Sequence, residues 1–316
     1  MRTRSRVLVL VTVLACLPAA FAAARVEKML ALPDGATFAL EADAGSVTLT
    51  GTDRADVKLL IEWNKDLDSE FNLSVEQTPA AVRVKLVRKG SWLRSFSGKV
   101  PAFTIEVPAR APVSIDTSGG AVVATRVKEA RLETSGGDLK VADVSGPLSA
   151  ETSGGDVDAE RIEGDATLET SGGDVRASAI RGGVKAETSG GNISLLDVAG
   201  DVGAETSGGS IEIVRVGGRI DAETSGGSIR AEFGAGNFKG GRLETSGGSI
   251  DVRIDPAANL VLDGETSGGS VTSDVPVTVS GKTGSSSLRG KIGNGGPELV
   301  LRTSGGSIHV APLTAR

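Results

Sequence analysis

The tetrapeptide Thr-Ser-Gly-Gly recurs along most of the chain at an almost constant interval. Counted from one Thr to the next, the spacing is 17, then 18 five times, then 21, 21 and 37, and the last interval contains a degenerate copy at residues 283–285. A period of roughly 20 residues predicts a solenoid or array in which each copy packs on its neighbours. The copies begin at Thr117, Thr134, Thr152, Thr170, Thr188, Thr206, Thr224, Thr245, Thr266 and Thr303.

Residues 184–199 show what one copy is expected to form. Apolar or small residues alternate with polar ones over 184–188, and the alternation resumes in the opposite phase over 192–195, after Gly190 and Gly191. A period of two residues indicates a β-strand, and a Gly pair marks a corner of the chain. Each copy therefore predicts at least two short strands joined at a glycine corner.

Two all-β architectures fit this pattern. In an antiparallel meander each Gly pair is a hairpin turn, but the apolar face then needs a cover that the sequence does not offer. In a parallel β-helix, or β-solenoid, each copy is one coil and equivalent apolar residues stack inside, so burial favours the solenoid. Crossover chirality favours a right-handed coil. The expected interior columns are Val157, Val175, Ile193, Ile211, Ile229 and Ile250, with Ala150, Leu168, Ala186, Ala204 and Ala222.

An insertion interrupts the repeat near its start. Residues 41–49 form a degenerate first copy, and the regular copies resume only after residue 113. Between them, residues 71–75, 82–86 and 103–107 alternate as three strands. We expect an antiparallel excursion that caps the N-terminal end of the solenoid, because an open end exposes unpaired strand edges.

The composition excludes several classes of protein. The chain of 316 residues has one His and one Cys, which is too few for a His/Cys zinc site or a disulfide framework. Aromatic residues make up 3%, so the core is not packed with large rings. With 39% hydrophobic residues, the chain is nevertheless too apolar to be disordered.

Residues 1–24 have the pattern of a secretory signal peptide. Three Arg precede the apolar run 7–17, and small residues follow up to Ala24. A lipoprotein anchored through Cys16 is the alternative. No other long apolar run occurs, so we expect no transmembrane segment in the mature chain. The chain would then be exported across the inner membrane to the periplasm or the cell surface.

Three stretches give the chain a family resemblance. They are GSVTLTGTD at residues 45–53, FTIEVPARAPVSIDTSGG at residues 103–120, and the iterated TSGGD or TSGGS. With these marks the chain resembles the bacterial putative-adhesin β-strand-repeat family, a secreted domain of unknown function. The resemblance implies a parallel β-helix at the cell envelope without known catalysis. It carries over no active-site residue.

A Glu precedes Thr-Ser-Gly-Gly in eight copies, and strand parity points it outward. Stacked coils are about 4.8 Å apart, so neighbouring carboxylates repel. The column suggests binding of a divalent cation or of a cationic partner, or else a solvated polar face. Asp138, Asp156 and Asp174 add a second partial column. One carboxylate per coil supplies few of the six to eight oxygens that calcium takes. The column comprises Glu133, Glu151, Glu169, Glu187, Glu205, Glu223, Glu244 and Glu265.

The insertion contains a basic segment with aromatic residues. Loss of the signal peptide takes the formal charge from −6 to −9, yet residues 77–103 contain no acidic residue. An acidic chain is a poor nucleic-acid binder, whereas a basic segment with aromatics suits anionic lipid or polysaccharide. The alternative is a hairpin tip that folds back on the cap. The candidate binding residues are Arg88, Lys89, Trp92, Arg94, Phe96 and Lys99.

No catalytic constellation is evident, and the lone His309 falls on an outward column. We therefore expect a signal peptide at 1–24, a first coil with its antiparallel insertion at 25–115, and a solenoid at 116–316. The expected function is non-enzymatic adhesin-like binding or scaffolding, with envelope polysaccharide, anionic lipid or another surface protein as partner. A polysaccharide-active β-helix enzyme and a calcium-stabilised rod are the alternatives. No cofactor other than calcium is expected.

Overall fold

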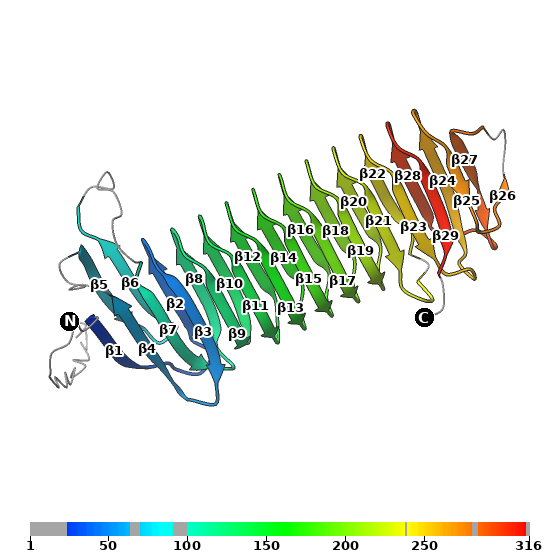
Figure 1. The fold of residues 1–316 in the computed structure, drawn as a ribbon. Helices are drawn as coiled ribbons and strands as arrows, with labels where there is room; N and C mark the ends of the chain where they lie inside the picture. Colours follow the sequence, from blue (N-terminus) through cyan, green and yellow to red (C-terminus); the bar gives the residue numbers. More distant parts are fainter. Residues whose placement is uncertain (1–23, 64–69, 91–99, 238, 280–283, 314–316) are drawn as a thin grey trace, which may run out of the picture.

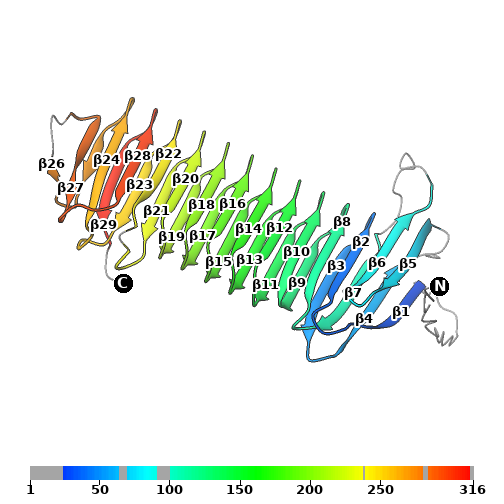
Figure 2. The same cartoon turned by 180° about the vertical axis from the view of Figure 1, so that it is seen from behind.

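The computed structural model describes residues 24–63, 70–90, 100–237, 239–279 and 284–313. The expected signal peptide and part of the basic segment lie outside these residues. The described chain forms two mostly parallel sheets that run side by side along an elongated body (Figures 1 and 2). The expected all-β solenoid is confirmed.

Sheet A has 14 strands, and each is hydrogen-bonded to the next in space. In spatial order they are β1 (Ala24–Ala31), β4 (Asp56–Trp63), β7 (Ala102–Pro108), β3 (Ser46–Thr52), β9 (Val122–Val127), β11 (Leu139–Val144), β13 (Val157–Ile162), β15 (Val175–Ile180), β17 (Ile193–Val198), β19 (Ile211–Val216), β21 (Ile229–Phe233), β23 (Ile250–Ile254), β29 (Ile308–Pro312) and β25 (Val271–Ser273).

Sheet B has 15 strands, which are likewise hydrogen-bonded to their neighbours. In spatial order they are β26 (Thr278–Val279), β27 (Ser287–Ile292), β24 (Leu260–Thr266), β28 (Glu298–Thr303), β22 (Gly241–Thr245), β20 (Ile220–Thr224), β18 (Val202–Thr206), β16 (Val184–Thr188), β14 (Ala166–Thr170), β12 (Leu148–Thr152), β10 (Glu129–Thr134), β8 (Pro112–Thr117), β2 (Thr37–Ala42), β6 (Ala81–Arg88) and β5 (Phe71–Gln77).

One regular coil consists of a sheet B strand, a Thr-Ser-Gly-Gly corner, a sheet A strand and a return corner. Strand β16 pairs in parallel with β14 and β18, and β17 pairs in parallel with β15 and β19. A meander would instead pair β16 with β17 across the Gly pair. The two strands lie in different sheets, which excludes the meander in this region.

The interior is lined by small and branched apolar side chains. Ala186 is buried between Leu168 and Ala204 in sheet B, and Ile193 is buried between Val175 and Ile211 in sheet A. Every residue of the expected interior columns is at most 4% exposed. Alternation along each strand therefore places one set of side chains in the core and the other on the outer faces.

The Thr of each corner also lies inside and links neighbouring coils. The Thr188 hydroxyl donates to the Gly173 carbonyl of the preceding coil at 2.9 Å. It also accepts from the Gly191 amide of its own corner at 3.3 Å. Equivalent bonds join Thr170 to Gly155 and Thr206 to Gly191. The hydroxyls thus satisfy backbone groups that the turn leaves without a ladder partner.

The N-terminal insertion differs partly from the expected antiparallel excursion. Strands β6 and β7 are parallel to β2 and β3, so these two strands add a further coil outside the first one. Their inward residues repeat the alternation of a coil, which explains this pairing. The antiparallel strands are β5 on β6, β4 on β7 and β1 on β4, and these form the end of the described body.

The C-terminal coils do not follow the order of the sequence. Strands β28 and β29, the last in the chain, lie between the coil β22/β23 and the coil β24/β25 (Figure 1). Strands β26 and β27 form an antiparallel hairpin on β24, so the interpretation of residues 283–285 as a degenerate coil is wrong in its described part. Residue 283 lies outside the described residues.

Candidate functional site

Stacked carboxylates run along the outer face of sheet B, and we call them the carboxylate column. Glu169, for example, lies directly between Glu151 and Glu187 on the neighbouring strands. The expected outward stacking is present from Glu133 to Glu244. Asp116 and Glu41 extend it at the N-terminal end, so nine consecutive coils each present one carboxylate.

The last member of the expected column is not where the sequence order predicts it. Glu265 is separated from Glu244 by Arg302, because β28 lies between β22 and β24. At the other end Lys85 follows Glu41, with its amino group 2.6 Å from the carboxylate. A cation therefore ends the column on each side. The sequence contains a sign of this interruption, since Arg302 precedes the copy at Thr303, whereas Glu precedes the copies at Thr245 and Thr266.

Cations also lie beside the column on the same face. Lys185 Nζ is 2.7 Å from Glu187 and 3.8 Å from Glu169, and these carboxylates raise the pKa of Lys185, Glu187 most strongly through its hydrogen bond. Arg131 and Arg242 pair in the same way with the Glu two residues on. Across the described residues, no cation lies within ion-pair distance of Glu151, Glu205 or Glu223. Repulsion along the column is therefore relieved at some coils only.

Asp116, near the N-terminal end of the carboxylate column, has a perturbed titration. Its pKa lies above the usual range because of partial burial first, and then because of Glu133 and Glu41. The folded state consequently binds this proton more tightly than the unfolded chain does. The free energy of unfolding therefore gains a contribution as pH falls through the folded pKa toward 3.8.

We expect Asp116→Asn to be more stable than the parent at pH 7, by about 0.5 kcal/mol, because it removes the charge that repels Glu41 and Glu133 on the neighbouring strands. The advantage should shrink as pH approaches 3.8, which urea unfolding at several pH values measures. Asp143→Asn is the control of opposite sign. A hydrogen bond from Arg161 lowers the pKa of Asp143, so that variant should lose stability above pH 3.8. An Asp116→Asn variant less stable than the parent at pH 7 would contradict the repulsion.

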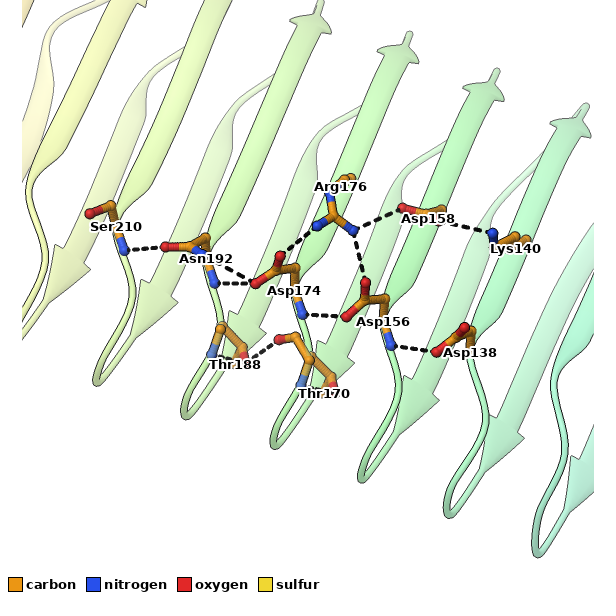
Figure 3. Close-up of polar contacts among 12 residues, drawn as sticks. Asp138, Lys140, Asp156, Asp158, Thr170, Asp174, Arg176, Thr188, Asn192 and Ser210 are labelled. Carbon is orange, nitrogen blue, oxygen red and sulfur yellow. Dashed lines mark hydrogen bonds and ion pairs between the residues drawn. The ribbon is translucent and has the colours of Figure 1, made fainter.

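The second acidic column joins neighbouring coils through their backbones (Figure 3). Asp138 Oδ1 accepts a hydrogen bond from the Asp156 amide, and Asp156 Oδ1 accepts one from the Asp174 amide at 2.9 Å. Asp174 Oδ1 accepts a hydrogen bond from the Asn192 amide in the same way, and Asn192 Oδ1 accepts one from the Ser210 amide. Asp, Asn and Ser share an acceptor oxygen, which explains why they replace one another here.

Arg176 pairs with the second oxygens of Asp156 and Asp174 in this column, and with Asp158 on the neighbouring strand (Figure 3). Its guanidinium is 3.0 Å from Asp156 Oδ2 and 3.6 Å from Asp158 Oδ1, and it also pairs with Asp174. The Asp174 amide, and then Arg176, lower the pKa of Asp156. Within the described ranges, no group of three or more His, Cys, Asp or Glu could hold a metal ion. These oxygens serve the stacking of coils.

The described candidate residues of the basic segment, Arg88 and Lys89, lie at the end of β6, at the N-terminal end of the solenoid. The chain from β6 to β7 links a sheet B strand to a sheet A strand, as the Thr-Ser-Gly-Gly corner does in regular coils. The Arg88 amide donates to Asp43 Oδ2 at 2.7 Å, and the Lys89 amide donates to the Glu70 carbonyl at 2.7 Å. Trp92, Arg94, Phe96 and Lys99 lie outside the described residues.

His309 lies on the outer face of sheet A, as its column predicts. Its ring nitrogens are 3.7 Å from Asp251 and 2.9 Å from Asp274, and the side chain is 43% exposed. It thus takes part in the charged surface of the last coils. No helix in the described ranges has the length and hydropathy needed to cross a membrane.

Comparison with known proteins gives one family and several solved structures. The family model Toastrack DUF4097 matches residues 34–200 and again 198–311. A putative adhesin from Bacteroides fragilis is 14% identical, with a TM-score of 0.40 over 92% of this chain and 97% of that one. A putative lipid binding protein from Parabacteroides distasonis is 13% identical, with a TM-score of 0.41 and the same coverage. No curated protein matches the chain.

Proposed function

The chain belongs to the Toastrack DUF4097 family, and from that premise we propose that it is a non-enzymatic envelope protein whose solenoid positions an anion-binding segment. The observation that carries the proposal is the replacement of one corner. Regular corners are closed by Thr–Gly bonds, whereas between β6 and β7 the chain instead carries Arg88, Lys89 and the basic residues that follow. The solenoid acts as the scaffold and this end makes the contact.

The partner chemistry follows from the charges of this segment. Residues 77–103 contain six Lys or Arg and no Asp or Glu, while the remainder of the exported chain is strongly acidic. Trp92 and Phe96 lie among the cations, and amphipathic aromatics favour an interface between water and lipid. The partner is an anionic surface, either lipid headgroups or acidic polysaccharide.

Vesicle binding tests the proposal. We expect the full chain to sediment with phosphatidylglycerol vesicles at low salt but not with phosphatidylcholine vesicles. Arg94→Gln with Lys99→Gln should weaken binding about 30-fold, at about 1 kcal/mol for each cation lost. Lys140→Gln with Arg230→Gln removes the same charge from the solenoid surface and is the matched control.

Two results would reject the vesicle prediction. One is an absence of binding to both vesicle types and to an acidic polysaccharide such as polygalacturonate. The other is an equal loss of binding in the control variant, which would show that only net charge matters. Binding to the polysaccharide alone would assign the site to polysaccharide.

A calcium-stabilised rod is the rival proposal. Glu205 and Glu223 are neighbours in the carboxylate column beside Gly203, where the lack of a side chain contributes to a hollow of about 240 Å³. A cation there would bridge two coils and oppose their repulsion. Thermal unfolding in calcium compared with a chelator separates this proposal from the first.

A further inference from the structure

Two segments of the chain are suited to the same position in the solenoid. The coil that packs next to β22/β23 needs a Thr-Ser-Gly-Gly corner. Both ETSGGSV at residues 265–271 and RTSGGSI at residues 302–308 supply one. The first segment follows the copy at Thr245 at the same interval as that copy follows the one at Thr224. The structure nevertheless places the later segment there, and Thr303 bonds the Gly248 carbonyl at 2.7 Å.

We propose that Leu301 and Arg302 select the last coil for this inner position, over Gly264 and Glu265 of the preceding coil. The last coil is thereby inserted between two coils that precede it in the sequence. Both edges of β28 and β29 are paired, although they end the described chain. Insertion of the last coil locks the C-terminal end of the solenoid.

Packing gives the first reason for the selection. Leu243, Leu301 and Gly264 follow one another in a single inward column of sheet B. Leu301 is 0% exposed and fills the core between its neighbours. In the consecutive order Gly264 would lie between the two Leu and leave a void there, whereas in the observed order it belongs to the outer coil.

Charge gives the second reason. Arg302 stands between Glu244 and Glu265, and its guanidinium is 3.7 Å from Glu265 and 2.9 Å from Asp263. In the consecutive order Glu265 would instead stack directly on Glu244. Like charges directly opposite each other on neighbouring strands destabilise a sheet.

Other contacts at this end of the solenoid discriminate less between the observed order and the consecutive order of the coils. In the consecutive order Asp263 would face Arg242, so Asp263 keeps a cationic neighbour in either order. In sheet A, β29 matches the five residues of β23, whereas β25 has only three residues. The length of β25 therefore acts in the same direction as Leu301 and Arg302.

The disulfide that forms shows which of the two coils lies next to the coil β22/β23. Asp251 lies directly opposite His309 in the observed order, and Thr272 is one strand further away. A disulfide joins Cα atoms about 4.4–6.8 Å apart, so it bridges adjacent strands but not alternate ones. In a Cys16→Ser background, oxidation of Asp251→Cys/His309→Cys reports the observed order. Asp251→Cys/Thr272→Cys reports the consecutive order.

We expect the parent sequence to form the 251–309 disulfide in large excess over the 251–272 disulfide. Exchange of the two dipeptides (Gly264→Leu, Glu265→Arg, Leu301→Gly and Arg302→Glu) should raise the ratio of 251–272 to 251–309 disulfide at least tenfold. Arg302→Glu alone should raise it less, and 0.5 M salt should reduce that effect.

The Arg302→Glu variant keeps the test decisive if the chain with both dipeptides exchanged does not fold. A ratio that changes less than twofold in every folded variant overturns the proposal. So does a folded exchanged chain that forms neither disulfide, because its coils would then have adopted neither order.

Discussion

Gly191→Ala is expected to lower the free energy of unfolding by roughly 3 kcal/mol, the scale of an overpacked core. A Cβ on Gly191 would stand 1.9 Å from the Gly173 oxygen and 2.4 Å from the Gly173 carbon of the preceding coil. Both are backbone atoms, so no side chain can rotate away. The coils would have to separate at this corner, which also lengthens the Thr188 bond to Gly173.

Gly190→Ala is the matched control, one residue earlier in the same corner. Its Cβ would stand 3.6 Å from the nearest atom, the Gly172 oxygen, which is ordinary contact. We expect a change within about 0.5 kcal/mol, because a compatible Gly→Ala replacement acts mainly by restricting the unfolded chain. Denaturant unfolding followed by circular dichroism gives both values. Equal losses in the two variants would refute the assignment of the close approach to the second Gly alone.

This contrast explains the tetrapeptide in physical terms. The second Gly of each corner lies against the corresponding Gly of the preceding coil, as Gly173 does against Gly155. The first Gly has more space, and the Ser points outward. The repeat is therefore mainly a device for stacking corners closely, and its regularity does not by itself indicate a ligand.

Much of the solenoid follows from the sequence, because its period and alternation are local signals. The constant interval between copies puts Val175, Ile193 and Ile211 in one column, and the structure buries all three. Strand alternation likewise places Glu169 on the outer face. These features depend only on the residues of one coil and its nearest copies.

The order of the last coils was not predictable in the same way. The corners at Thr266 and Thr303 are locally equivalent, so the choice depends on what each segment meets after folding. Gly264 and Leu301 differ in the volume they fill, and Glu265 and Arg302 differ in charge. Such differences act only between coils, whereas a prediction based on the period treats the copies as identical.

The roles of the polar columns were predictable only in part. The stacking of Glu follows from the repeat, but the cations beside it, such as Lys185, occur at irregular coils. Asp156 and Asp174 point outward by parity, yet their oxygens bind the backbone of the next coil. The succession of Asp, Asn and Ser at that position was the available signal, since all three accept hydrogen bonds.

Thr188→Val is expected to lower the free energy of unfolding by about 2–3 kcal/mol, because an unsatisfied buried backbone group costs about 1–3 kcal/mol. Valine keeps the shape and the β-branching of threonine, so packing and strand propensity change little. The Gly191 amide, which is buried, loses its acceptor, and the Gly173 carbonyl loses its donor. Denaturant unfolding measures the loss.

Thr167→Val makes the same chemical change on the outer face of β14, one coil earlier. There we expect a change within about 0.5 kcal/mol, the usual range for surface substitutions. Amide exchange adds a local measurement, because loss of the hydroxyl should accelerate exchange at Gly191 more than at residues two coils away. If Thr188→Val and Thr167→Val unfold at the same denaturant concentration, the interior hydroxyls contribute nothing to stability. The corner would then be held by glycine stacking alone.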